Sequence, residues 1–102
     1  MTALKAKTRA AVLQIAEWQL GVVEMPTNSN KVKYNTAYYG REVSGGAYAW
    51  CMAFTWWVFR EAGFNLYKTA RCSAFVQRYR TAAPAQVVTS GYKPGGIVFF
   101  DF

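Results

Sequence analysis

Apolar residues between Leu4 and Leu20 recur at the spacing of one face of an α-helix, with charged and amide residues between them. The apolar positions are Leu4, Ala11, Val12, Ile15, Ala16 and Trp18, and the polar ones are Lys5, Lys7, Arg9, Gln14 and Glu17. This pattern predicts one amphipathic helix that ends at Gly21, the expected C-cap.

The segment from Val22 to Gly46 is dense in residues that favour turns. These residues are Pro26, Asn28, Ser29, Asn30, Asn35, Gly40, Gly45 and Gly46. Such a density prevents a long regular element, so we expect an ordered loop, held in place by Tyr34, Tyr38 and Tyr39.

Two further helices are predicted in the second half of the chain. Trp50–Glu61 is apolar nearly all round and is followed by the stop signal Gly63, which is typical of a central, buried helix. Arg71–Arg80 is amphipathic, and Pro84 lies beyond its end. We expect it to bury Phe75, Val76 and Tyr79 and to expose Arg71, Arg78 and Arg80.

The C-terminal stretch has the composition of short strands. After Val87-Val88 and a turn over Gly91–Gly96, the run Ile97–Phe102 reads as a buried strand. A strand at the end of the chain leaves its backbone groups in need of a partner. We therefore expect either a complementing half encoded downstream or a homodimer formed through this strand.

Composition restricts the class of protein. A chain of 102 residues with 53% hydrophobic and 18% aromatic residues is one folded domain at most, and is unlike a disordered chain. The formal net charge of +7 favours polyanionic partners such as a bacterial cell wall or a nucleic acid, although solubility alone explains it equally well.

Ala47–Phe59, the longest apolar stretch, is too short to cross a bilayer, and the N-terminus has no signal-peptide pattern. We therefore expect synthesis in the cytoplasm without a Sec signal, no membrane insertion, and two free thiols rather than a disulfide.

Cys51 is the candidate for chemistry because it lies where a glycine-rich loop gives way to the predicted central helix. The positive end of the helix dipole favours a thiolate there, and unpaired amides at a helix start can receive an oxyanion. The alternative is that Cys51 is a small buried hydrophobe.

The surroundings of this cysteine resemble a known family. Trp50-Cys51-Met52-Ala53-Phe54, followed by Trp56-Trp57-Val58 and Glu61-Ala62-Gly63, resembles the nucleophile segment of the cysteine, histidine-dependent amidohydrolase/peptidase (CHAP) domain. The similarity extends to Gln19–Val22, Glu24, Asn28, Asn30, Lys33-Tyr34, Tyr38–Gly40, Ala70–Ser73 and Lys93–Phe100. At Gly96 the chain departs from the aspartate that is usual in the family.

The resemblance implies a function at the bacterial cell wall. CHAP domains of phage or prophage endolysins hydrolyse an amide bond of peptidoglycan after release to the wall, and they use a cysteine nucleophile. The implied fold is α+β and papain-like, truncated here to its mainly helical N-terminal half with one or two short C-terminal strands. Residues 1–102 then form a single incomplete domain, for which we expect no cofactor and no metal.

The sequence contains no histidine, so the general base of the family is missing. One imidazole normally deprotonates the thiol and then protonates the leaving amine. No other residue replaces it convincingly on sequence grounds, so we expect Cys51 to be alkylated without turning over substrate.

Four further residues are candidates for binding substrate: Trp50, Glu24, Asn30 and Tyr48. For Glu24, Asn28 and Asn30 the alternatives are a substrate groove, a calcium site or simple turn hydrogen bonds. Trp56 and Trp57 are expected in the core, and Cys72 is interpreted as a structural thiol.

Two other function classes stay open. One is a non-catalytic wall-binding or regulatory module. The other, less favoured, is a small nucleic-acid-binding protein, suggested only by charge and aromatic content and without a recognisable binding motif. With peptidoglycan as the expected partner, we expect no nucleic-acid partner.

Overall fold

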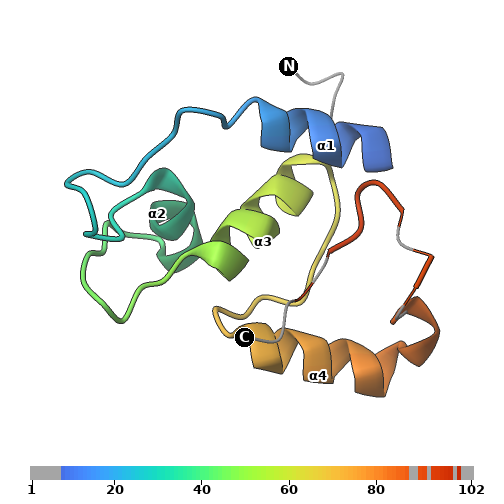
Figure 1. Cartoon of the computed structure of the whole chain (residues 1–102). Coiled ribbons are helices and arrows are strands. Elements are labelled where there is room, and N and C mark those ends of the chain that lie inside the picture. The colour runs from blue at the N-terminus through green and yellow to red at the C-terminus, as the bar shows by residue number, and fades with distance from the viewer. Residues whose placement is uncertain (1–7, 88–89, 92, 98, 100–102) are drawn as a thin grey trace.

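Helix α3 (Cys51–Glu61) runs through the middle of the molecule, and α1 (Arg9–Glu17) and α2 (Lys33–Tyr39) pack on it (Figure 1). Helix α4 (Cys72–Ala82) lies below α3 in this view and is followed by the 3-10 turn η2 (Pro84–Gln86). The computed structural model describes residues 8–87, 90–91, 93–97 and 99. None of the helices described is long and apolar enough to span a membrane.

Helix α1 confirms the predicted amphipathic helix over its described part. Thr8 caps it, because its Oγ1 accepts a hydrogen bond from the amide of Ala11 at 3.0 Å. The helix ends at Glu17 instead of continuing to Leu20. Trp18 and Leu20 are 50% and 85% exposed, so no core surface rewards a further helical turn. The predicted residues before Thr8 lie outside the described part of the chain.

The core lies between α1 and α3. Ala11, Val12 and Ile15 of α1 are buried against Val58 and Ala62. Partly buried residues surround this cluster, namely Ala16, Phe54, Trp57, Phe59 and Phe64. Burial of this apolar face supplies most of what holds α1 in place, since helices of this length are marginal in isolation.

Helix α2 corrects the prediction of a continuous loop over Val22–Gly46. Within that segment Tyr34 and Asn35 are 1% and 0% exposed, so the helix forms because it buries these two side chains. Gly40, at φ 74°, ends it, and its amide donates to the carbonyl of Thr36 at 2.9 Å.

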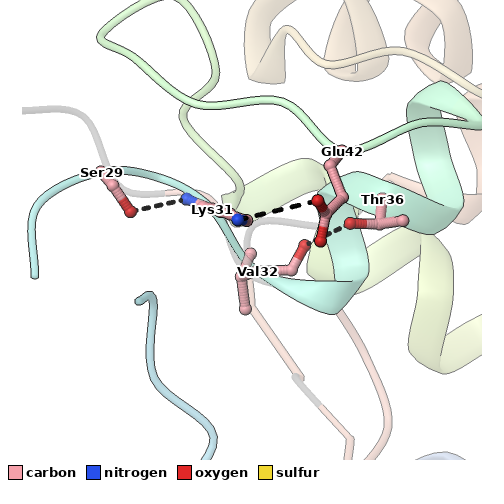
Figure 2. Close-up of polar contacts among 5 residues, drawn as sticks. All are labelled: Ser29, Lys31, Val32, Thr36 and Glu42. Carbon is pink, nitrogen blue, oxygen red and sulfur yellow. Dashed lines mark hydrogen bonds and ion pairs between the residues drawn. The ribbon is translucent and has the colours of Figure 1, made fainter. Parts of the chain in front are cut away.

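Local polar contacts fix the entry into α2 (Figure 2). The amide of Lys31 donates to Ser29 Oγ at 3.1 Å, and the hydroxyl of Thr36 donates to the carbonyl of Val32 at 3.4 Å. Lys31 Nζ also lies 3.6 Å from Glu42 Oε1 across the loop that follows the helix. The ion pair joins the two ends of the α2 segment but is solvent-exposed, so it adds little stability.

Helices α3 and α4 confirm the two helices predicted in the second half, each shifted by one or two residues. Phe75 is buried as expected, whereas Val76 and Tyr79 are half-buried. Arg71, Arg78 and Arg80 are exposed, as predicted.

The C-terminal segment passes between α1 and α4 (Figure 1). Its Gly95 lies so close to α1 that a Cβ there would be 2.9 Å from the Cβ of Arg9. The ring of Phe99 lies 5.6 Å from that of Phe75 of α4. This segment therefore connects the two helices, although Ile97 and Phe99 belong to no regular element.

The expected α+β papain-like fold is wrong for this chain. The residues described form four α-helices and one 3-10 turn, with no strand among them. A strand needs a neighbour for its backbone hydrogen bonds, and the described chain offers none beside Ile97 and Phe99. Helices satisfy these groups internally, and the described residues form an all-helical fold. Val98 and residues 100–102 of the predicted strand, and Val88 of the shorter one, lie outside the described residues.

Candidate functional site

Cys51 is the first residue of α3 and is exposed to solvent. The residue before it, Trp50, makes no side-chain capping bond to the helix. The first amides of an α-helix have no partner within the helix, so the start of α3, where Cys51 lies, offers hydrogen-bond donors. An electrophile can reach this thiol from solvent, and an oxyanion formed on it would meet those amides.

A second thiol lies next to the first. Cys72 is the first residue of α4, is half-buried, and places its Sγ 3.6 Å from Sγ of Cys51. Figure 1 shows the first turns of α3 and α4 close to each other in the lower centre of the molecule. Like α3, α4 lacks a side-chain cap at its start. Both cysteines are free thiols, as predicted.

The environment of Cys72 keeps that thiol protonated. Burial raises the pKa of Cys72, and the hydrogen bond and the charge of Cys51 raise it further. Cys72 therefore keeps its proton near neutral pH, and either sulfur can donate in the contact between the two thiols. Sequence reasoning missed this pairing, because it depends on the packing of α4 near the start of α3 and no local pattern reports it.

Trp50 precedes the nucleophile candidate in the chain and is stacked on a buried tyrosine. The ring centroids of Trp50 and Tyr34 are 5.5 Å apart with 22° between the planes. The hydroxyl of Tyr34 donates to Gln19 Oε1 at 3.0 Å, which fixes the tyrosine at the end of α1. Trp50, Tyr34 and Gln19 then line one open depression of about 290 Å³, together with Leu20 and Phe54. Trp50 is thus held in place and half-exposed beside Cys51.

Glu24 and Asn30 lie in the loop before α2 and bond to each other. Glu24 Oε2 accepts the backbone amide of Asn30 at 2.5 Å, and Asn30 Nδ2 donates to the carbonyl of Gly45 at 2.9 Å. Asn28 and Asn30 have left-handed backbones, with φ of 64° and 61°. The polar atoms of Glu24 and Asn30 thus fold the loop, and their role in binding substrate stays a prediction.

Asn35 connects this loop to the approach to Cys51. Its side chain is fully buried, and Nδ2 donates to the carbonyl of Asn30 at 2.9 Å and to that of Tyr48 at 2.7 Å. Among the described residues its Oδ1 has no partner. The sequence marked Asn35 only as a turn former, and nothing in its neighbourhood distinguishes a buried bridging amide from an exposed one.

Tyr48 completes the set of candidates at the end of the glycine-rich loop. Its ring meets that of Tyr39 edge-on at 5.1 Å, and its hydroxyl accepts a long hydrogen bond from Arg41 Nη2 at 3.5 Å. With Asn35 holding its carbonyl, Tyr48 fixes the loop that leads to Trp50 and Cys51.

The residues described supply thiols, aromatic rings and helix-start amides, and the sequence supplies no imidazole. No group of three or more histidine, cysteine, aspartate or glutamate side chains suited to a metal ion occurs in the described part of the chain. Two thiols alone fall short of the ligand set of a structural zinc site. The chemistry that the site offers is therefore that of an accessible thiol with a protonated thiol beside it.

Comparison with known proteins finds no family model, no curated protein and no solved structure that matches this chain.

Proposed function

We propose that this chain provides the cysteine nucleophile of a hydrolase that cleaves an amide bond of bacterial peptidoglycan, and that it is catalytically incomplete alone. The observation that supports the proposal is the exposed thiol of Cys51 at the uncapped start of α3. The proposal concerns this nucleophile and its substrate class, and it does not depend on the expected papain-like fold, because the residues that the structure describes form no strand.

The chemistry assigned to Cys51 is acyl transfer. Its thiolate attacks the amide carbonyl, and the oxyanion of the tetrahedral intermediate accepts hydrogen bonds from the first amides of α3. Collapse of the intermediate breaks the C–N bond and leaves an acyl group on Sγ. The departing amine must gain a proton, and water must then be activated to release the acyl group.

Both proton transfers lack their usual catalyst in this chain, because it contains no histidine. Cys72 holds a proton close to Cys51, but its raised pKa makes its thiolate scarce near neutral pH. We therefore expect acylation of Cys51 by an activated substrate, and no sustained turnover.

Hydrolysis of an activated ester separates these two steps. With nitrophenyl acetate the chain is expected to release a burst of about one equivalent of nitrophenolate, followed by a much slower phase. Cys51→Ala is expected to abolish the burst, whereas Cys72→Ser, which leaves Cys51 in place, is the matched control. Rapid multiple turnover would contradict the incompleteness, and a burst that survives in Cys51→Ala would contradict the assignment of Cys51.

The same pair of variants tests the substrate class on Gram-positive cell walls. Turbidity is expected to stay constant with the chain alone, and mass spectrometry of Cys51 after incubation with peptidoglycan fragments is expected to show an acyl adduct. Cysteine-dependent lysis would show that a base is recruited from these residues. The absence of any adduct on Cys51 from wall fragments, together with a normal ester burst, would reject peptidoglycan as the substrate.

A non-catalytic wall-binding module is the second candidate, and the arrangement of cations over aromatic rings favours it. Lys68 Nζ lies 4.8 Å from the ring of Trp56 and 4.9 Å from that of Tyr38. Arg60 lies 4.8 Å from the same tryptophan. These cations are exposed on a chain of net charge +7, so they offer a basic and aromatic face to anionic wall polymers. Salt-sensitive co-sedimentation with walls that is unchanged in Cys51→Ala, in a chain without an ester burst, would establish this function.

A further inference from the structure

The two thiols, Cys51 and Cys72, offer a second kind of chemistry besides acyl transfer. Cys51 and Cys72 are 21 positions apart in sequence, and folding brings their sulfurs to 3.6 Å. The proposed hydrolysis uses Cys51 alone and gives Cys72 no covalent role. The sequence holds no other cysteine, so any thiol chemistry between residues of one chain must occur here.

We infer that Cys51 and Cys72 are a site of reversible disulfide formation, in which a low-molecular-weight disulfide such as glutathione disulfide is the oxidant. The Cys51 thiolate attacks one sulfur of the oxidant, the S–S bond of the oxidant breaks, and one thiolate leaves and takes up a proton. Cys72 then loses its proton to solvent and attacks Sγ of Cys51, which expels the second small thiol. Two electrons pass from the protein thiols to the oxidant, and two small thiols are released.

Exposure assigns the order of these steps. Cys51 is exposed, so it meets the oxidant first, whereas Cys72 is half-buried and keeps its proton. The mixed disulfide on Cys51 then lies within reach of Cys72. The sulfurs need to approach by only about 1.5 Å to reach the disulfide bond length of about 2.05 Å.

The backbone around the two cysteines also suits the bond. Each is the first residue of its helix, so neither sulfur is held in the rigid middle of a helix. The connection between α3 and α4, residues 62–71, contains no regular element and follows Gly63 at φ 91°. Exposed Arg71, directly before Cys72, adds a positive charge that attracts an anionic oxidant such as glutathione disulfide.

Disulfide formation would control the nucleophile. Cys51 bound to Cys72 has no thiolate to attack a carbonyl, and reduction restores it. This consequence depends on the proposed acyl-transfer function, whereas formation of the disulfide does not.

The test incubates the reduced full chain with glutathione disulfide, blocks remaining thiols with an alkylating reagent, and measures the intact mass. The expected product is about 2 Da lighter than the reduced protein and carries neither glutathione nor an alkyl group, because both thiols are in the disulfide. A dithiol reductant is expected to restore the reduced mass. Its rate of resolution is expected to be independent of protein concentration, because both sulfurs belong to one chain. Peptide mapping of the wild-type protein is expected to find the Cys51–Cys72 cross-link.

Matched variants separate the steps. Cys72→Ser is expected to stop at a stable glutathione adduct on Cys51, and Cys51→Ser to react much more slowly at Cys72. A stable glutathione adduct on wild-type Cys51, or a cross-link only between two chains, would overturn the inference.

The burst with the activated ester distinguishes failure of the disulfide site from failure of the proposed acyl-transfer function. A burst that is lost on oxidation and restored by reduction links the two. A cross-linked chain that never showed a burst keeps the disulfide site and rejects the nucleophilic function.

Discussion

At the scale of single residues, Asn35 is the polar side chain on which the site depends most. It is fully buried and donates to two carbonyls, one in the loop that contains Glu24 and Asn30 and one in the loop that leads to Cys51. A buried carbonyl that loses its donor pays the cost of desolvation without compensation. One amide thus joins two loops that are distant in sequence.

Replacing this residue should therefore be costly. Asn35→Ala is expected to lower the free energy of unfolding by about 2–4 kcal/mol, because it removes a fully buried side chain and leaves two partly buried carbonyls without their donor. Asn35→Asp, which keeps the shape but has no amide donor, is expected to destabilise comparably. Urea denaturation measures both, with the exposed Asn65→Ala as a control that should change stability by no more than about 0.5 kcal/mol. Equal stability of Asn35→Ala and the wild type would show that the two carbonyls do not depend on this bridge.

At the scale of elements, α2 is where sequence and structure differ most instructively. Its seven residues lie in a segment rich in asparagine and glycine, and its only clear boundary signal is Gly40. Gly40 has a left-handed backbone at φ 74°, and a Cβ added there would meet no atom within 4 Å. Any cost of a side chain at this position therefore comes from the backbone conformation and not from a clash.

A pair of glycine substitutions isolates that cost. Gly40→Ala is expected to destabilise the protein by about 1 kcal/mol, since alanine resists the left-handed conformation that ends α2. Gly46→Ala is the matched control, because Gly46 has equally open surroundings without a left-handed backbone, and it is expected to be neutral or slightly stabilising. Thermal unfolding followed by circular dichroism compares the two. Identical melting temperatures would contradict the helix end at Gly40.

The sequence predicts an element well when the element depends on neighbouring residues, and poorly when it depends on contacts with distant parts of the chain. The periodicity of α1, the apolar run of α3 and the stop at Gly63 are local, and they predicted those helices to within a few residues. Helix α2 exists because Tyr34 and Asn35 are buried by other parts of the chain, which no local pattern reports. The apolar run from Ile97 suggested a strand because its local pattern is that of a strand. A strand also requires a partner, however, and the described residues do not provide one.

The site shows the same division. Cys51 was predicted from its place at a helix start, and the structure has it there, exposed. Its pairing with Cys72 depends on how α4 returns toward α3, so a sequence with two widely spaced cysteines could not reveal it. Likewise, the stacking of Trp50 on Tyr34 results from the packing of α2 on α3.

At the scale of the whole molecule, the response to alkaline pH follows from the buried acidic groups. Burial raises the pKa of Tyr34 and of Tyr38, and in Tyr38 the charges of Tyr39 and Tyr67 add to the effect. Burial and the neighbouring Cys51 raise the pKa of Cys72 from its ordinary value of 9.0. In each case the neutral form is favoured by folding, so the unfolded chain releases its proton at a lower pH than the folded chain does.

The sign of the pH dependence is then fixed. The stabilisation by these groups is complete below their unfolded pKa values, about 9 for the thiol and about 10 for the phenols, and is lost as pH rises through the higher folded values. The melting temperature is therefore expected to change little from these groups between pH 7 and about 8.5, and to fall steadily above pH 9.

Two variants show which residue causes each stage of the fall in melting temperature. Cys72→Ser is expected to reduce the loss of stability that begins near pH 9, whereas Tyr34→Phe is expected to reduce the loss above about pH 10. Tyr34→Phe also removes the hydrogen bond to Gln19, so its stability at pH 7 should drop by about 1 kcal/mol. The variants are therefore compared by the slope of melting temperature against pH. Tyr48→Phe is the control for that slope, because Tyr48 is half-buried and makes only a 3.5 Å hydrogen bond. A wild-type melting temperature that rises between pH 9 and 11 would mean that folding favours the ionised forms, contrary to the burial of Tyr34 and Cys72 described above.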